Sequence, residues 1–319
     1  MQKGILVHPQ ELSYAWIDRA AESGIDVLGL HPVGGPEADK SLRELLVALK
    51  TPEMRAMLDY AAQKGLKIEY EMHAASYLLD RNLFASHPEC FRMDGSGNRN
   101  PDGNFCCSNA AALRLAADNA ARLAQQLYRS EHKFYFWLDD IRGMHCRCPQ
   151  CRELSASDMQ LKVVNAFVRQ IRTVIPDAQV AYLAYYECMQ LPQTVKPAQG
   201  VFLEYAPIEK YCPDPNGDGR GAQREYESME PLIGFFGAEN SKVLEYWLDN
   251  SLFSNWTKPP KEFHCAPARQ IRQELDRYEQ LGFESAATFA CYLGADYEAL
   301  YGNPDITDFT RAFRPHDKS

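Results

Sequence analysis

The strongest constraint on the fold of this chain is an eightfold alternation of short apolar segments with longer amphipathic ones. The short segments have the length and composition of strands, and they lie at residues 4–8, 26–31, 67–73, 134–139, 179–186, 200–205, 242–249 and 285–292. Segments typical of amphipathic helices lie between them, at 9–23, 52–64, 109–129, 157–174, 222–236 and 266–281. Gly24, Gly65 and Gly282 each mark a helix end just before a strand. This alternation predicts βαβ units and a parallel sheet.

Eight such units predict an α/β fold, a single (β/α)8 TIM barrel that spans 1–319 as one domain with a C-terminal tail at 303–319. A doubly wound sheet is the alternative, but no Gly-x-Gly-x-x-Gly follows an early strand, so its dinucleotide-binding version has no support. Long loops follow strands three, four and six, where barrel enzymes usually carry their sites. The segment between strands five and six is short and contains Pro192 and Pro197, so we expect no full helix there.

Composition excludes several classes of protein. The chain has 34 Lys and Arg against 43 Asp and Glu, a formal net charge of −9, and no basic run. This balance argues against nucleic acid as a partner. No apolar run approaches the ~20 residues that span a bilayer, so we expect no membrane partner. The N-terminus reads as a strand, which favours a cytoplasmic protein unless a leader peptide was removed. The oligomeric state is left open.

Two strands carry polar residues that alternate with apolar ones. Glu69, Glu71 and His73 share one face of the third strand, and Glu245, Trp247 and Asp249 share one face of the seventh. We expect the apolar faces to meet the helices and the polar faces to point into the barrel. Glu69 and Glu245 lie deeper, where ion pairing is an equal alternative. Glu71, His73, Trp247 and Asp249 lie nearer the carboxyl ends, which favours contact with a substrate.

The fourth strand gives the sharpest signal. Five apolar or aromatic residues, 134–138, lead directly into Asp139 and Asp140 at the predicted carboxyl end of the strand. Such a pair can bind a metal, cap a helix or perform acid–base chemistry. Arg142 and Gly143 follow, and no helix begins there, so we favour catalysis over capping. Aromatic walls help one carboxyl to stay protonated while the other stays charged.

Aromatic residues near the predicted barrel mouth suit the flat faces of sugar rings, with core packing as the alternative. The candidates are Trp137, Trp247, Trp256, Tyr185, Tyr186 and Tyr205. We add His31 and Glu204, which lie at or near the carboxyl ends of the second and sixth strands. A carbohydrate is therefore the expected partner, and no organic cofactor is implied.

A cysteine cluster predicts a metal site. Cys146, Cys148 and Cys151 lie within six residues, and structural zinc needs a fourth ligand. Cys106, Cys107 and His145 are the candidates, and unmetallated or disulfide-linked cysteines are the alternative. A second pattern, Asp214, Asn216, Asp218 and Glu225, has the spacing of a calcium loop. Because Pro215 follows the first ligand and no entering helix is evident, we favour a polar turn and leave it out of the predicted metal site.

The fourth-strand segment Phe136-Trp137-Leu138-Asp139-Asp140-Ile141 resembles a signature of family 84 N-acetylglucosaminidases and, more loosely, the Asp-Glu pair of family 20. Both are barrels that use substrate-assisted retaining hydrolysis. The resemblance implies that Asp139 polarises the 2-acetamido group of the substrate. It also implies that Asp140 is the general acid and then the general base. The cysteine-rich stretch after the pair departs from that pattern.

A broader resemblance is to a bacterial domain-of-unknown-function family described as glycoside-hydrolase-like. The matching blocks are His87-Pro88-Glu89, Phe105-Cys106-Cys107-Ser108-Asn109, Cys146-Arg147-Cys148-Pro149-Gln150-Cys151 and residues 245–254. This resemblance favours Cys106 as the fourth ligand, because it occupies a matched position and its loop is expected to adjoin the loop after strand four. Zinc there would be structural, clamping the loop after Asp140.

The leading hypothesis is a retaining glycoside hydrolase that removes a terminal N-acetylhexosamine-type sugar. One alternative is another glycosidase, such as an α-glucuronidase-like barrel, for which Arg81, Arg99 and Arg142 are the candidate uronate-binding cations. The other is a non-catalytic carbohydrate-binding barrel, whose acids only bind hydroxyls. The identity of the sugar, the anomer and the linkage stay open.

Overall fold

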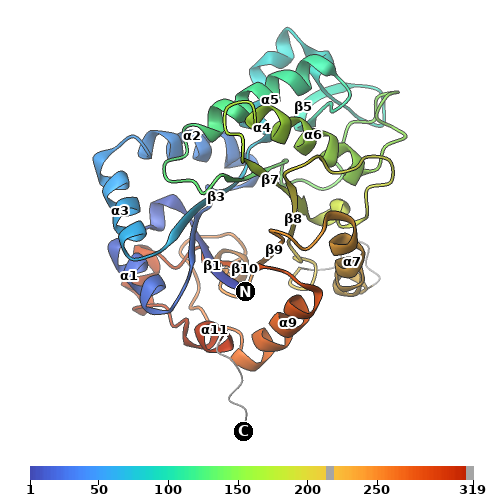
Figure 1. The fold of residues 1–319 in the computed structure, drawn as a ribbon. Helices are drawn as coiled ribbons and strands as arrows, with labels where there is room; N and C mark the ends of the chain where they lie inside the picture. Colours follow the sequence, from blue (N-terminus) through green and yellow to red (C-terminus); the bar gives the residue numbers. More distant parts are fainter. Residues whose placement is uncertain (213–218, 314–319) are drawn as a thin grey trace. The chain divides into compact units, whose positions relative to one another are not determined.

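The computed structural model describes residues 1–212 and 219–313. Within them, eight parallel strands form a closed barrel in the order β1-β10-β9-β8-β7-β6-β3-β2, which confirms the predicted α/β barrel (Figure 1). These strands are β1 (Gln2–Val7), β2 (Val27–Leu30), β3 (Lys67–His73), β6 (Lys133–Trp137), β7 (Gln179–Ala184), β8 (Val201–Tyr205), β9 (Lys242–Glu245) and β10 (Ser285–Phe289). Each of them overlaps one of the eight predicted segments.

The helices are α1 (Tyr14–Glu22), α2 (Ala38–Ala48), α3 (Pro52–Gln63), α4 (Ala75–Leu78), α5 (Ala110–Ala124), α6 (Ala156–Ile171), α7 (Gly221–Phe236), α8 (Asn250–Phe253), α9 (Ala268–Leu281), α10 (Ala295–Tyr301) and α11 (Thr307–Ala312). Each of the six predicted helical segments overlaps a helix of the structure, namely α1, α3, α5, α6, α7 and α9. Side-chain caps fix several of their starts: the Ser155 hydroxyl accepts the Asp158 N–H at α6, for example. Gly282 ends α9 in the left-handed region at φ 88°, which glycine adopts without strain.

The chain divides into two compact units, which we describe separately. Unit 1 comprises Met1–His31, Pro52–Glu69 and Ala238–Ser319. Its strands β1, β2, β9 and β10 pair in parallel, β10 with β9 and β1 with both β10 and β2. Gly4 lies where β1 and β10 approach closely, since a Cβ there would come within 2.9 Å of the Ala287 Cβ.

Unit 2 comprises Pro32–Thr51 and Tyr70–Gly237. It contains β6, β7 and β8 with the carboxyl half of β3, and α5 lies beside α6 (Figure 1). Between β7 and β8 there is no full helix, only the short 3-10 helix η5 (Tyr186–Met189), as the two prolines predicted.

The elements missed from the sequence include the short helices α4, α8 and α10 and the three features that follow. Helix α2 precedes α3, so two helices follow β2 where the simple alternation suggests one. The long segment after β3 contains an antiparallel hairpin of β4 (Phe91–Met93) and β5 (Arg99–Phe105), whose short and polar strands have no clear alternation of apolar residues. Helix α11 lies within the predicted tail at 303–319, and its Phe309 is fully buried.

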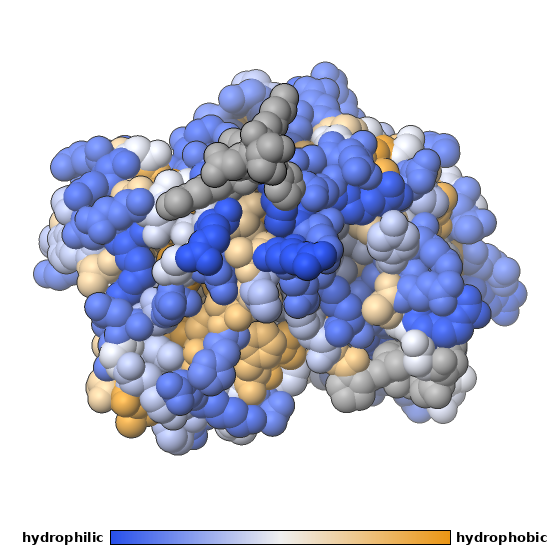
Figure 2. All heavy atoms as spheres, turned by 90° about the horizontal axis from the view of Figure 1, so that it is seen from below, coloured by the Kyte–Doolittle hydropathy of each residue, from blue (hydrophilic) through white to orange (hydrophobic). Residues whose placement is uncertain are grey.

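Ten large hydrophobic residues are exposed in the part of the chain that the structure describes. The face drawn in Figure 2 is mostly hydrophilic, with hydrophobic residues gathered in a smaller area. Among the described residues, no helix combines the length and apolarity that crossing a bilayer requires.

Candidate active site and candidate metal centre

The two adjacent carboxylates follow β6 directly and lie in different environments. The Asp139 side chain is only 6% exposed and pairs with the Arg81 guanidinium at 2.6 Å. Its backbone N–H donates to the Asn104 Oδ1 at 2.8 Å. The carbonyls of Pro101 and Gly103 accept hydrogen bonds from Arg81. Strand β5 therefore fixes the backbone of Asp139 through Asn104. Arg81, which is itself held by carbonyls of β5, fixes the Asp139 carboxylate.

Asp140 points to the next strand of unit 2. Its Oδ1 accepts the Tyr185 hydroxyl at 3.1 Å, and Asp140 is half-buried rather than enclosed. Gly34 keeps space beside it, because a Cβ at that position would lie 2.9 Å from the His73 ring and 3.9 Å from the Asp140 Oδ2. No helix begins at the pair, so neither carboxylate is used as a cap.

The residues beneath the pair form a buried polar layer. The Trp137 indole N–H donates to Glu204 on β8 at 2.6 Å. The His73 Nδ1 donates to the Leu138 carbonyl at 2.6 Å, and its ring meets the edge of Trp137. Trp137 and Glu204 are both fully buried, so they support the floor of the site.

Two adjoining cavities lie in unit 2, and Asp139 lines the smaller one. The smaller is lined by His73, Asn104, Asp139 and Tyr185, among others. The larger has a volume of about 730 Å³, and both share Tyr186 and Glu187. The Tyr185 and Tyr186 rings lie 3.8 Å apart, and the Arg142 guanidinium lies 3.6 Å from the centre of the Tyr186 ring. The larger cavity is lined mainly by polar and charged side chains, and its volume is that of a small-molecule site.

The prediction for β9 was wrong about its faces. Glu245 accepts the Tyr278 hydroxyl of α9, and the Trp247 indole donates to Glu274 of α9 at 2.6 Å and packs against Phe309 of α11. Trp247 therefore faces helices and is not placed for substrate contact. Both faces of this strand are buried, so alternation alone does not say which face points inward.

The other predicted substrate residues have the following surroundings, each described within its own unit. Glu71 and Tyr205 are fully buried in β3 and β8 of unit 2. In unit 1, the His31 ring contacts His8 and Phe289. Asp249 caps α8, its Oδ1 accepting the Ser251 hydroxyl at 2.6 Å. Burial raises the pKa of Asp249 to about 6.

Sequence reasoning missed three residues near these sites. Arg81 was weighed only as a uronate-binding cation, and Asn104 was not considered. His8 follows β1 directly and stacks on His31 with 5.7 Å between ring centres. The available signal for His8 was its place at the carboxyl end of the first predicted strand.

Four of the predicted metal ligands come together. The thiols of Cys106, Cys146, Cys148 and Cys151 all lie within 4.8 Å of one another and are buried. The Cys106 Sγ is 3.8 Å from both the Cys148 and the Cys151 Sγ. Tetrahedral zinc with Zn–S bonds of ~2.3 Å requires sulfur–sulfur distances of ~3.8 Å, so this set can bind such an ion. No disulfide joins cysteines among the described residues.

The other candidate metal ligands do not belong to the set of four cysteines. The Cys107 Sγ lies 3.7 Å from the Cys151 Sγ but outside the set of four. His145 lies with Glu187, 3.9 Å away. Asp214, Asn216 and Asp218 of the possible calcium loop lie outside the described residues, whereas the buried Glu225 accepts the Glu209 N–H at 2.8 Å.

Comparisons with known proteins agree with this fold. A family model, "Domain of unknown function (DUF4838)", matches residues 45–227. No curated protein matches the chain. Among solved structures, the cellulose synthase subunit Z of Clostridioides difficile is 11% identical, with a TM-score of 0.52 over 98% of this chain and 100% of that one.

Two further solved structures are glycosidase barrels. Endo-glycoceramidase II from Rhodococcus sp. is 10% identical, with a TM-score of 0.54 over 91% of this chain and 72% of its own. The Bacteroides ovatus GH5 xyloglucanase is 14% identical, with a TM-score of 0.50 over 98% and 74%. At these identities, the likeness shows a glycosidase-like barrel fold.

Proposed function

The chain belongs to the DUF4838 family, and we propose that it is a retaining glycoside hydrolase that removes a terminal N-acetylhexosamine-type sugar by substrate-assisted catalysis. The observation that carries the proposal is the contrast between two adjacent carboxylates. Asp139 is buried and ion-paired with Arg81, whereas Asp140 is more open and is hydrogen-bonded only by the Tyr185 hydroxyl among the described residues. Two carboxyl groups in unlike environments can perform unlike roles.

The proposed reaction assigns one role to each carboxylate. The acetamido oxygen of the substrate attacks the anomeric carbon, so the enzyme supplies no nucleophile. Asp139, paired with Arg81, accepts the acetamido N–H and stabilises the positive charge that develops. Asp140 donates a proton to the glycosidic oxygen and later accepts one from the attacking water. Tyr185 and Tyr186 provide an aromatic wall for the sugar ring.

The α-glucuronidase-like alternative has less support. A uronate needs an available cation, but Arg81 is paired with Asp139 and Arg142 with Glu209 at 3.0 Å. Arg99 donates to the Phe91 carbonyl and contacts the Cys146 Sγ, so it belongs to the cysteine cluster.

The function is tested with aryl glycosides of different sugars, using Asp139→Asn and Asp140→Asn, with the exposed Asp177→Asn as the matched control. Asp140→Asn should slow substrates with poor leaving groups by ~10²-fold or more, and activated phenols much less. Asp139→Asn should slow every N-acetylated substrate, whatever its leaving group. Wild-type turnover in both variants would refute the proposal. Weaker sugar binding by a protein that hydrolyses nothing would favour the carbohydrate-binding alternative.

We also propose that the four-cysteine set holds structural zinc. Cys106 directly follows β5, the strand that fixes Asp139, so an ion there would stabilise the support of the active site. The thiolates must stay reduced, which favours a reducing compartment such as the cytoplasm. We propose further that the barrel acts as one domain.

A further inference from the structure

The larger cavity of unit 2 extends beyond the residues that the proposed hydrolysis uses. Its volume of about 730 Å³ lies within the ~300–1,000 Å³ that is typical of small-ligand sites. The lining comes from the loops after β6 and β8, from the segment between β7 and β8, and from α7. Because β6, β7 and β8 are neighbouring parallel strands, these segments meet at their carboxyl ends, where barrel enzymes bind substrates.

This cavity is connected to the proposed general acid through two tyrosines. The Asp140 Oδ1 accepts the Tyr185 hydroxyl at 3.1 Å, and the centre of the Tyr185 ring lies 3.8 Å from that of Tyr186. Tyr186 lines both cavities. Arg142, two residues after Asp140 in the chain, has its guanidinium 3.6 Å from the centre of the Tyr186 ring and also lines the larger cavity. A group that leaves after protonation by Asp140 is thus released beside this cavity.

The polarity of the lining suits a sugar better than a lipid. The side-chain amides of Gln190 and Gln193 can each donate and accept hydrogen bonds, as sugar hydroxyls do. Met189, Leu191 and Pro231 add apolar surface, which suits the apolar face of a pyranose ring. A lipid chain would displace water from the polar side chains without replacing its hydrogen bonds.

The charge of the lining disfavours an anion. Carboxylates outnumber guanidiniums among the described lining residues, which include Glu187, Glu209, Glu225 and Glu227 against Arg142 and Arg224. The Glu209 carboxylate pairs with both arginines, at 3.0 and 3.7 Å, so neither guanidinium is reserved for a ligand. A carboxylate or sulfate group on a ligand would therefore meet an excess of negative charge.

We propose that the larger cavity is the subsite for the leaving group and that it binds a second, uncharged sugar residue. The substrate is then an oligosaccharide rather than a glycolipid or a chain of uronic acids. This inference deepens the proposed function and rests on it, because the terminal sugar has to lie against Asp139 and Asp140. The acetamido oxygen forms a bond to the anomeric carbon, the bond from that carbon to the glycosidic oxygen breaks, and the proton of Asp140 moves to that oxygen. The second sugar is released into the cavity as an alcohol.

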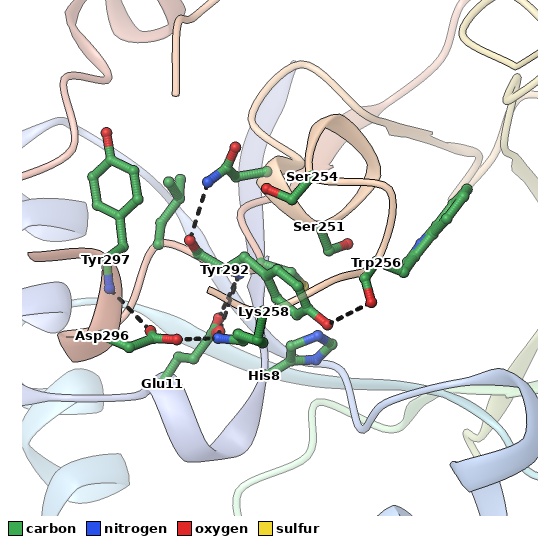
Figure 3. A network of polar contacts seen from close by, with 12 residues as sticks. His8, Glu11, Ser251, Ser254, Trp256, Lys258, Tyr292, Asp296 and Tyr297 are labelled. Carbon is green, nitrogen blue, oxygen red and sulfur yellow. Dashed lines mark hydrogen bonds and ion pairs between the residues drawn. The ribbon is translucent and has the colours of Figure 1, made fainter. Parts of the chain in front are cut away.

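A polar network in unit 1 provides a comparison and a control. Lys258 pairs with Glu11 at 3.5 Å and with Asp296, and its Nζ lies 4.1 Å from the centre of the Tyr292 ring (Figure 3). Glu11 accepts the Tyr292 backbone N–H through both carboxylate oxygens, at 2.9 and 3.0 Å. These charged groups are partnered within the network, and the Trp256 indole is turned away from them (Figure 3). The network is therefore structural, and its Asp296 serves as a control outside unit 2.

The test compares leaving groups on one terminal sugar, namely the sugar that the aryl glycoside screen selects. The substrates are the glycosyl fluoride, a disaccharide whose second sugar is glucose, and a disaccharide whose second sugar is glucuronic acid. Fluoride is a single atom and needs no subsite, whereas the two disaccharides differ only in a hydroxymethyl and a carboxylate group. The wild type should hydrolyse the glucose disaccharide with a kcat/KM at least about tenfold above that for the glucuronic acid disaccharide.

Variants of the lining test the cavity itself. Gln193→Trp combined with Glu227→Trp fills it from two exposed positions and should lower kcat/KM for the glucose disaccharide about tenfold, with the fluoride unchanged. Glu227→Lys should raise kcat/KM for the glucuronic acid disaccharide about fivefold, because it reverses one charge of the lining. The controls should change none of these rates: they are Glu230→Trp and Glu230→Lys, at an exposed position of α7 outside the lining, and Asp296→Asn.

The subsite is overturned if the double tryptophan variant hydrolyses the glucose disaccharide as the wild type does. It is equally overturned if the wild type cleaves both disaccharides at the same rate. If the double variant also slows the fluoride, Glu227→Lys decides, and an unchanged rate for the glucuronic acid disaccharide in that variant refutes the subsite.

Failure of the hydrolase proposal gives a different result, because the wild type then cleaves none of the substrates, the fluoride included. Saturation-transfer NMR with methyl β-glucoside then tests whether the cavity binds a sugar. Transfer that is present in the wild type and lost in the double tryptophan variant supports the sugar site. Transfer that is absent from the wild type, or kept by the double variant, overturns it.

Discussion

At the scale of the residue, two adjacent side chains of the same type can lie in different environments. Asp139 and Asp140 are adjacent, yet one is clamped by Arg81 and the other meets only Tyr185 among the described residues. The position of this pair was predictable from the apolar run before it. Its partners were not, because Arg81 and Tyr185 are tens of residues away in the chain. The hydrogen-bond partner of His8, the His31 carbonyl, could not be named either, since it lies 23 residues away in the chain.

Asp249 provides a pH test of burial at this scale. Burial raises its pKa to about 6, from an ordinary value of 3.8. Between pH 4 and 6 the unfolded chain therefore loses the Asp249 proton while the folded protein keeps it. The folded state then loses stability as the pH rises through this window, by about 3 kcal/mol at 1.36 kcal/mol per unit.

Urea unfolding at several pH values measures this effect. Asp249→Asn cannot ionise but keeps the cap of α8, so its unfolding free energy relative to wild type should rise between pH 4 and 6 and stay constant above pH 7. The exposed Asp305→Asn serves as the control. A constant difference between Asp249→Asn and wild type across the window would contradict a raised pKa.

At the scale of the element, the β4–β5 hairpin joins the two candidate sites. Strand β5 supplies the carbonyls that hold Arg81 and the Asn104 side chain that holds Asp139, and Cys106 follows it directly. The sequence predicted the cysteine cluster from its spacing but not this hairpin. Alternation in β9 was recognised, yet its inward face was misassigned, because each face of the strand packs against a buried partner.

Zinc in the cysteine set is the prediction at this scale. Protein purified without added metal should contain about one zinc per chain by elemental analysis. Cys106→Ser and Cys151→Ser should lower this content and the urea midpoint, whereas the partly exposed Cys265→Ser should change neither. Chelation should increase hydrogen exchange in residues 138–155 of the wild type. A metal-free wild type, or a disulfide from Cys106 to Cys151 in reduced protein, would rule out the zinc site.

At the scale of the whole molecule, the barrel was predictable because strand and helix periods repeat eight times. The sequence predicted where one charged side chain inside the barrel lies, but not which residue pairs with it. Glu69 was expected to point inward, with ion pairing as one alternative, but its partner could not be named. Lys242 supplies it at 2.7 Å, from a strand 173 residues away. Such long-range partners follow from closure of the sheet rather than from local pattern.

The Lys242–Glu69 pair gives a test of that closure. Both side chains are nearly inaccessible to solvent, at 3% and 10% exposure. Lys242→Met should lower the free energy of unfolding by about 3–5 kcal/mol, because it removes the Lys242 cation from the buried Glu69 carboxylate. Lys242→Met with Glu69→Leu should recover most of that loss, since two apolar side chains of similar volume need no ionic partner.

Urea unfolding at pH 7 measures all three proteins in a double-mutant cycle. Arg311→Met, which breaks the exposed pair with Asp308, is the control and should cost less than about 1 kcal/mol. If Lys242→Met costs no more than Arg311→Met, the buried pair does not stabilise the barrel. If the double variant is no more stable than Lys242→Met alone, the loss comes from the Lys242 side chain itself and not from the Glu69 charge.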